Sequence, residues 1–389
     1  MPTPGIEAVK LAVLAAVPGD ASSPHLNRLS AYFTLKMLSE GTHQHSGEQL
    51  DQFFDFHASE VEHIQGLEQI GLSLLSTKKH FASVLPVFRS LFTEANFPEE
   101  RLDKLKKQKQ LSLKLRFQRN NQWASQRFRS LLFGPEHPYG EISTTEDVDA
   151  ITREDCVTFF REQLWAEPVL YLSGQFDEVS LRQILATFGD LPVRAAEPIG
   201  QKFPMHFPEK VYEAREEALQ SSIRIGTHLM PKAHPDYLPF YVFNVFLGGY
   251  FGSRLIKNIR EDKGLTYGIY SSIGSLKHQE YWMLMADVEK SQLQLALREI
   301  YLEIERMLEE PLPEDEVEVV RNYLAGSFLS KFSNAFDLME HFKAVDKQGL
   351  DMRFYEAQLQ YVKDFQPADI QAVAKKYLQL PRLLEVVVG

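Results

Sequence analysis

Two stretches of this 389-residue sequence carry the same landmarks at one fixed separation. Asp155 and Asp369 each lie in a helix-starting segment, and Gly174 and Gly389 each follow an apolar run. The segments 97–100 (FPEE) and 312–315 (LPED) both open long helical patterns. All three pairs lie 214 or 215 residues apart, which predicts an internal duplication, that is, two domains of one fold. A chance alignment of similar helix starts is the alternative.

The clearest boundary between the two copies is the segment 191–210, which holds four of the 20 prolines of the chain. Proline fixes φ and removes a backbone donor, so this composition favours an extended connector. We therefore predict an N-terminal domain over 1–195, a linker over 196–210 and a C-terminal domain over 211–389. Strand and helix patterns follow one another without a regular βαβ rhythm, which favours an α+β fold with antiparallel-rich sheets packed against helices.

The composition excludes several classes of protein. With 42 basic and 53 acidic residues the net charge is −11, whereas a general nucleic-acid binder needs clustered basic charge. Cys156 is the single cysteine, so an internal disulfide and a cysteine zinc cluster are impossible. No apolar run reaches the roughly 18 residues of a membrane-spanning helix. The run 11–17 (LAVLAAV) is interpreted as a buried strand rather than a signal-peptide core.

Five segments share their order and spacing with a known family. They are Met37–Thr42 (MLSEGT), Phe97–Glu100 (FPEE), His137–Gly140 (HPYG), Ala150–Asp155 (AITRED) and Leu247–Tyr270. Through them nearly the whole chain resembles the insulinase and pitrilysin metallopeptidases, the inverzincins, whose relatives include mitochondrial processing peptidase. The resemblance implies a half-clam of two homologous domains that closes with a second half-unit around a cavity.

The zinc motif of this family, His-x-x-Glu-His on a helix, is degenerate in this chain. Two histidines four residues apart would bind zinc, and the glutamate would activate the attacking water. Anchored on Met37, these three positions are Tyr32, Leu35 and Lys36, none of which suits its task. The remaining ligand position of the family falls at Ser112, on the helix after Pro98. The resemblance therefore implies a zinc-less, inactive type of subunit with no metal site of its own.

The segment 101–129 carries ten basic residues against the single acidic Asp103. A helix that faces a catalytic zinc would be expected to carry acidic residues instead. Such a run is usually a solvated basic face. The functional alternative is a docking surface for an acidic partner or peptide.

The second half retains the other element of the family's site. The glycine-rich stretch with Gly248, Gly249 and Gly252 resembles the family's flexible loop near the substrate, and Arg260 and Tyr267 match its Arg/Tyr pair. In relatives this pair steadies the substrate carbonyl and its oxyanion. A guanidinium and a phenol are suitable donors to developing negative charge. An ordinary ion pair and a core tyrosine are the alternative.

A second, histidine-based metal site is the competing interpretation of the N-terminal half. His43, His45, His57 and His63 lie close together in the sequence, although none completes a His-x-x-Glu-His motif. The segment 337–341 (DLMEH) has aspartate where the first histidine would stand. Isolated histidines are more often surface residues or satisfied core residues than ligands.

Two functions remain open at this point. The first is a catalytically incomplete, peptidase-like subunit that binds no cofactor itself and supplies Arg260 and Tyr267 to a zinc-bearing homologous subunit that hydrolyses peptides. The alternative is a non-catalytic scaffold or peptide-binding pseudopeptidase. The expected partners are the zinc-bearing homologue, or a second copy of this chain, and a peptide, which could bind by strand addition. The compartment, cytoplasmic or periplasmic, stays open, because the N-terminus lacks a signal sequence and could have been trimmed.

Overall fold

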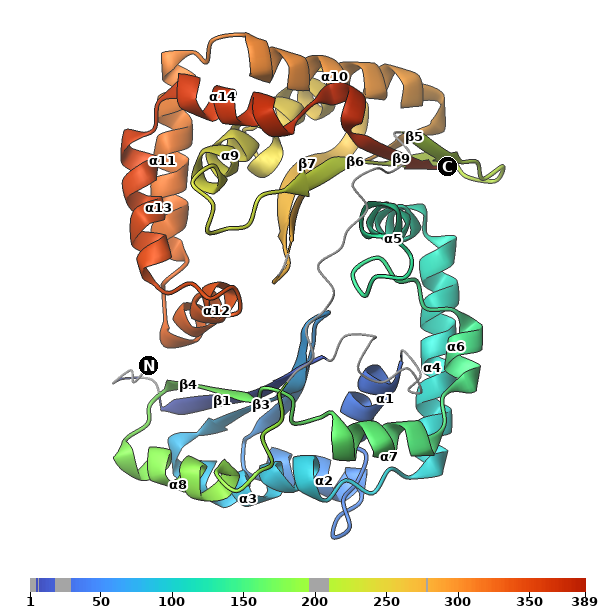
Figure 1. Cartoon of the computed structure of the whole chain (residues 1–389), viewed down its shortest axis with the longest axis vertical. Helices are drawn as coiled ribbons and strands as arrows, with labels where there is room; N and C mark the ends of the chain where they lie inside the picture. Colours follow the sequence, from blue (N-terminus) through green and yellow to red (C-terminus); the bar gives the residue numbers. More distant parts are fainter. Residues whose placement is uncertain (1–4, 6, 18–28, 196–209, 278) are drawn as a thin grey trace. The chain divides into compact units, whose positions relative to one another are not determined.

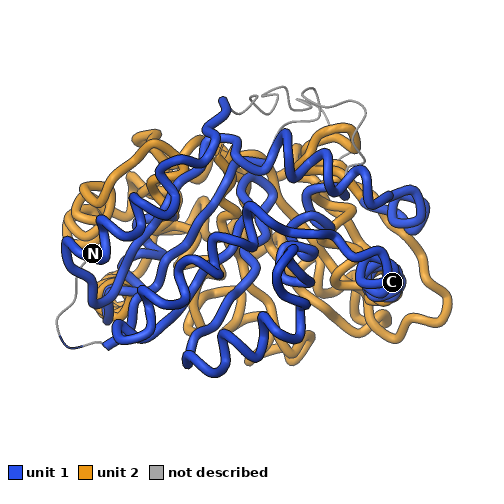
Figure 2. Tube along the Cα trace, turned by 90° about the horizontal axis from the view of Figure 1, so that it is seen from below, with its two compact units in different colours: residues 1–114, 143–200, 332–343 blue, residues 115–142, 201–331, 344–389 orange. Residues whose placement is uncertain are grey.

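The structure is a computed structural model, and it describes residues 5, 7–17, 29–195, 210–277 and 279–389. Two compact units divide the chain (Figure 2). Unit 1 comprises residues 1–114, 143–200 and 332–343, and unit 2 comprises residues 115–142, 201–331 and 344–389. No helix of the described part is long and apolar enough to cross a membrane.

Unit 1 is built on an antiparallel four-stranded sheet in the order β2-β3-β1-β4 (Figure 1). Its strands are β1 (Ala8–Ala16), β2 (Glu60–Gln65), β3 (Gln69–Thr77) and β4 (Val169–Gly174). Strand β1 pairs with β3 and with β4, and both of its faces are covered. Val9, Leu11 and Val13 lie in the main core of unit 1, whereas Ala12 and Leu14 pack with Tyr171 and Met339 in a second cluster. Burial on both faces explains why its sequence is a nearly continuous apolar run rather than an alternating one.

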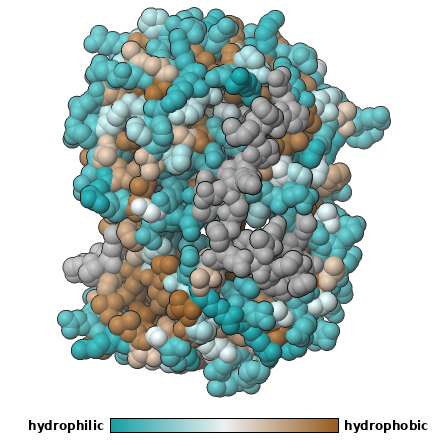
Figure 3. All heavy atoms as spheres, viewed as in Figure 1, coloured by the Kyte–Doolittle hydropathy of each residue, from teal (hydrophilic) through white to brown (hydrophobic). Residues whose placement is uncertain are grey.

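The helices of unit 1 bury their apolar sides against this sheet and against one another. They are α1 (Ser30–Met37), α2 (Gly47–Phe56), α3 (Lys78–Thr93), the first part of α4 (Glu99–Gln118), α6 (Thr145–Ala150), α7 (Arg153–Glu162) and α8 (Glu178–Phe188). Capping boxes fix three helix starts, at Ser46, Thr144 and Thr152. Figure 3 shows a mostly hydrophilic surface with a hydrophobic area in the part of unit 1 that holds β1, β4 and α8, where Leu170 and Leu185 are partly exposed.

Unit 2 has a five-stranded sheet in the order β5-β9-β6-β8-β7. Its strands are β5 (Lys210–Glu213), β6 (Gln220–Leu229), β7 (Thr266–Ser275), β8 (Glu280–Glu289) and β9 (Leu384–Val388). Without the added parallel strand β5, the order β9-β6-β8-β7 repeats the order β4-β1-β3-β2 of unit 1. The two sheets therefore have the same antiparallel topology, as the internal duplication predicts.

The helices of unit 2 enclose the second core. They are α5 (Asn120–Phe133), α9 (Tyr237–Asn244), the π-helical turns η2 (Val245–Gly249) and η3 (Ile256–Asp262), α10 (Leu293–Glu309), α11 (Glu314–Ser330), α13 (Arg353–Asp364) and α14 (Pro367–Tyr377). Helices α9, α10 and α14 lie over one face of the sheet (Figure 1). Helix α10 places Ala296, Ile300, Ile304 and Met307 in this core at helical spacing.

Each unit is made of segments that are not consecutive in the sequence. Residues 115–142, which carry α5, group with unit 2, and residues 332–343, which carry most of α12 (Ala335–Asp346), group with unit 1. The reason is packing: α5 contacts β6 and β9, and Met339 and Phe342 of α12 pack on Tyr171 of β4. The units thus differ from the sequential domains 1–195 and 211–389. Of the expected linker 196–210, residues 196–209 lie outside the described part.

Candidate functional site

Arg260 and Tyr267, seven residues apart in the sequence, meet in unit 2. Arg260 lies on η3 and Tyr267 is the second residue of β7, and a turn at Gly264, whose φ is +62°, joins the two elements. The Arg260 guanidinium lies 5.2 Å from the centroid of the Tyr267 ring and 5.2 Å from that of Phe251. Two aromatic faces therefore hold the cation by cation–π attraction.

The polar groups of both residues are available for a ligand. The Tyr267 side chain is 90% exposed, so the phenol is open to a ligand. Within the described residues Arg260 forms no ion pair, and its charge is not neutralised by a neighbouring carboxylate. The alternative of an ordinary ion pair with a core tyrosine does not describe this arrangement.

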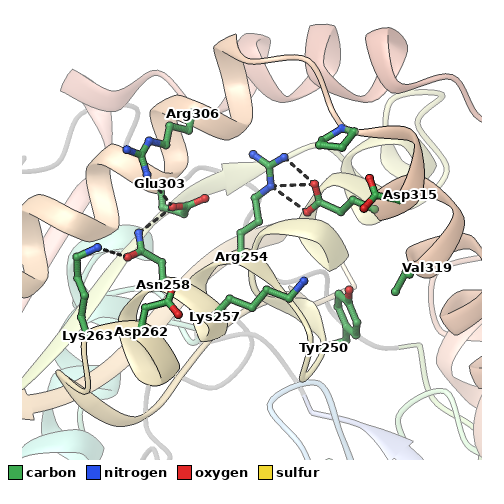
Figure 4. Close-up of a pocket in the computed structure, with 12 residues that line it drawn as sticks. Tyr250, Arg254, Lys257, Asn258, Asp262, Lys263, Glu303, Arg306, Asp315 and Val319 are labelled. Carbon is green, nitrogen blue, oxygen red and sulfur yellow. Dashed lines mark hydrogen bonds and ion pairs between the residues drawn. The ribbon is translucent and has the colours of Figure 1, made fainter.

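A network of buried carboxylates anchors η3, the turn that carries Arg260. It lines a cavity of about 490 Å³ between η3, α10 and α11 (Figure 4). Asn258 donates from Nδ2 to Glu303 at 2.8 Å, and Lys263 pairs with Glu299 at 3.1 Å and with Asn258. Glu303 and Glu299 are both buried on α10. A second contact holds the chain just before η3.

That second contact is the ion pair between Arg254 and Glu316 of α11. The Arg254 guanidinium donates from Nε at 2.9 Å and from Nη2 at 2.7 Å, one bond to each carboxylate oxygen. Such a bidentate pair fixes orientation as well as distance. The contacts of η3 with α10 and of Arg254 with α11 therefore fix the position from which Arg260 projects.

The glycine-rich stretch is a packed turn in this structure, not an open loop. Gly248 is buried in η2, and a Cβ atom there would lie 2.6 Å from Oγ and 2.7 Å from the backbone nitrogen of Ser271 in β7. Gly249 and Gly252 also have close neighbours, Asn244 and Tyr250. Gly248 thus permits close approach of η2 to the strand that carries Tyr267.

The degenerate zinc motif lies in unit 1, and its residues do not fit a zinc ion. Tyr32, Leu35 and Lys36 lie on α1, where Leu35 is fully buried in the core. Ser112 is an exposed residue of α4. The Lys109 ammonium of α4 lies 3.8 Å from the centroid of the Tyr32 ring. A tyrosine covered by a lysine thus occupies the position of the first ligand, and two ammonium groups, Lys36 and Lys109, would repel a dication.

The electropositive character of this region also acts on His63 of β2. Burial, and secondly the charge of Lys36, lower the pKa of His63 to about 4. The ring is held by a hydrogen bond of 3.0 Å between Nε2 and Ser39 Oγ. His63 is therefore neutral near pH 7.

This neutral histidine predicts a pH dependence of stability. The unfolded chain takes up a proton near pH 6.5 while the folded chain resists it down to about pH 4. Folding stability is therefore full above pH 6.5 and falls, by about 3 kcal/mol from this one group, as the pH drops to 4. Urea unfolding between pH 7 and pH 4 should show the loss, and the loss should shrink in His63→Gln. The control is His43→Gln, at an exposed histidine, which should lose as much stability as the wild type. An equal loss in His63→Gln and in the wild type would show that His63 is not the group responsible.

The four histidines of the competing metal site do not converge. His57 Nδ1 lies 2.8 Å from the Phe53 carbonyl oxygen, and its ring packs on Phe53 and His80. His63 contacts Ser39, and His43 is exposed. Among the described residues no three His, Cys, Asp or Glu side chains are grouped to hold a metal ion.

The structure brings Arg260 and Tyr267 together, and it adds neighbours that the sequence did not predict. Phe251 lies between Gly249 and Gly252, and its aromatic type could have suggested a contact with the arginine. Lys109 lies three residues before Ser112, on the same face of α4, and could have been found by helical spacing. The buried acids Glu299 and Glu303 gave no such signal, because their partners lie on another element.

Comparison with known proteins agrees with the resemblance drawn from the motifs. Residues 151–324 match the family model described as the peptidase M16 inactive domain. The chain is 22% identical over 329 residues to the uncharacterized zinc protease YmxG of Bacillus subtilis, covering 84% of this chain and 80% of that protein. It is 25% identical over 210 residues to the probable inactive metalloprotease YmfF of the same organism, covering 52% of this chain and 47% of that protein.

Solved structures show the same fold. The peptidase M16 inactive domain from Pseudomonas fluorescens superposes with a TM-score of 0.88 at 21% identity and covers 100% of this chain and 94% of that one. A protease from Helicobacter pylori gives a TM-score of 0.83 at 16% identity, with 100% and 95% covered. A chain of Complex III2 from Candida albicans gives 0.75 at 16% identity, with 100% and 92% covered.

Proposed function

We propose that this chain is a non-catalytic subunit that supplies Arg260 and Tyr267 to a zinc-bearing partner for the hydrolysis of peptides. Its match to the peptidase M16 inactive domain and its fold support this proposal. One observation carries the proposal: the Arg/Tyr positions of the family hold that pair, whereas its zinc positions hold no zinc ligands. In unit 2, Arg260 and Tyr267 contact each other and Tyr267 is exposed. In unit 1, the metal positions hold Lys36, the buried Leu35 and Tyr32, whose ring is covered by Lys109.

The chemistry of the pair suits this role. The Arg260 guanidinium stays charged at every physiological pH and offers several N–H donors, and the Tyr267 hydroxyl offers one more. Both can donate to a substrate carbonyl oxygen as negative charge develops on it. The network on α10 and α11 holds Arg260 in place before the substrate arrives, which reduces the cost of ordering it. The hydrolytic step itself would take place on the partner.

A mixing experiment tests this function. Purified chain is added to a zinc-bearing homologous subunit, and cleavage of a peptide library is followed by mass spectrometry. We expect the mixture to cleave faster than the homologue alone and this chain, as monomer or homodimer, to be inactive. A mixture no faster than the homologue alone would contradict the proposal.

The second candidate is a scaffold or a peptide-binding pseudopeptidase. It is favoured by the fold shared with a chain of Complex III2 and by the loss of every zinc position. A scaffold, however, needs neither an uncompensated Arg260 nor a fully exposed tyrosine beside it. The exposed pair therefore favours the first function.

A further inference from the structure

A cavity in unit 2, separate from the Arg260–Tyr267 pair, concentrates arginines in an otherwise acidic chain. It measures about 580 Å³, within the range of ligand sites, and lies on the face of the sheet that α5 contacts. Arginines from three elements line it: Arg116 from α4, Arg129 from α5 and Arg224 from β6. We call this cavity the arginine pocket.

Arg224 is built into the wall of the pocket. It is only 5% exposed, and its guanidinium donates 2.8 Å bonds to Ser125 Oγ, to the Asn121 carbonyl oxygen and to its own neighbour's carbonyl oxygen. The nearest carboxylate oxygen, Asp287 Oδ1, lies 3.6 Å from Nη1 and accepts no hydrogen bond. Neutral oxygens thus fix its geometry, and its charge is only partly compensated.

The other two arginines leave the pocket positively charged. Other cations of the basic run 101–129 are used locally: Arg101 pairs with Glu48, Arg127 pairs with Glu213 and Lys109 covers Tyr32. Neither Arg116 nor Arg129 forms an ion pair with any residue that the structure describes. In a chain of net charge −11, these two arginines give a local positive potential that no carboxylate of the described residues neutralises in an ion pair.

The lining beside Arg224 is apolar and adaptable, because Met285 is the cross-strand partner of Arg224. Met283 and Met285 of β8 and the rings of Tyr270 and Tyr281 complete the lining. Methionine side chains adjust to different apolar shapes, and tyrosine rings offer contact area at low entropic cost. The pocket therefore combines guanidinium groups with an apolar floor.

We propose that the arginine pocket binds the carboxylate of an acidic peptide segment, with the methionine floor receiving an apolar side chain next to it. Guanidinium groups match the planar, bidentate geometry of a carboxylate. The carboxylate could belong to an acidic side chain or to the C-terminus of the peptide. The proposal rests on the proposed function only in taking the ligand to be a peptide, and it names the class of peptide.

Direct binding to the isolated chain tests the pocket without any partner. The probe is a fluorescein-labelled nonapeptide with a central Leu-Glu-Leu and an amidated C-terminus, followed by fluorescence polarisation. Matched probes carry Gln in place of Glu, with either an amidated or a free C-terminus. We expect the Glu probe or the free-acid probe to bind at least about tenfold more tightly than the fully amidated Gln probe, and more weakly as salt is added. The tighter of the two identifies the source of the carboxylate.

The pocket variant is Arg116→Gln with Arg129→Gln, because both side chains reach solvent and neither is fixed by an ion pair. It should lose this preference, whereas Arg353→Gln, at a side chain 85% exposed in a surface ion pair, should keep it. Equal binding of all probes, or an unchanged preference in the pocket variant, would overturn the proposal. Stronger competition by succinate or by an oligonucleotide than by unlabelled acidic peptide would also overturn it. Because no cleavage is measured, failure here leaves the mixing experiment unaffected.

Discussion

The variant Arg260→Ala is expected to lower the joint peptidase activity of this chain and a zinc-bearing partner by about 10²–10³-fold, the usual cost of removing one donor to an oxyanion. The guanidinium has no ion pair in the described structure, so its removal leaves no carboxylate unpaired. We therefore expect thermal unfolding of the chain and its assembly with the partner to stay unchanged. The initial rate of peptide cleavage in the mixture is the measurement.

Two further variants sharpen this experiment. Tyr267→Phe removes one hydroxyl donor and keeps the ring that supports Arg260, so its effect should be smaller than that of Arg260→Ala. Arg353→Ala removes an arginine of the same unit whose side chain is 85% exposed and serves as the control. Full joint activity of Arg260→Ala with normal assembly would favour the scaffold.

Asn244→Ala is expected to destabilise unit 2 by about 2–4 kcal/mol, because it leaves two buried donors without an acceptor. Asn244 is 5% exposed, and its Oδ1 accepts bonds of 2.8 Å from Trp282 Nε1 and from Ser271 Oγ. These bonds tie the end of α9 to the two strands beside the glycine-rich turn. Urea unfolding followed by far-UV circular dichroism measures the loss.

Its control uses the indole. Trp282→Phe removes the N–H donor while keeping an aromatic ring in the core, so Asn244→Ala should cost less in that background than in the wild type. A cost below about 0.5 kcal/mol in the wild type would show that water or another acceptor replaces Asn244. Equal costs in both backgrounds would show that the bond to Trp282 is not stabilising.

Periodicity and repeated landmarks predict the architecture well. Apolar runs such as 169–172 and 383–388 correspond to β4 and β9, and the offset of 214–215 residues corresponds to sheets of equal topology. What the sequence does not predict is the exchange of segments between the units. Helix α5 looks like a continuation of the basic run of α4, and only its contacts with β6 and β9 assign it to unit 2.

The site shows the same division between local and long-range information. The exposed Arg260–Tyr267 contact could be expected, because the two residues are close in sequence and match one motif. The Lys109–Tyr32 contact joins residues of different helices, and the supports of η3 come from α10 and α11. The packed position of Gly248 required the coordinates of β7, since the sequence predicts only a flexible glycine stretch.

We propose that this chain lacks the zinc ligands of a peptidase site and retains the Arg/Tyr pair. The most direct test is the zinc content per chain, measured by elemental analysis of protein purified without chelators and then supplied with zinc. We predict zinc well below one per chain, because Tyr32, Leu35, Lys36 and Ser112 offer no ligand set and Lys36 and Lys109 repel a dication. Tightly bound zinc at one per chain would contradict it and would indicate an enzyme that acts alone.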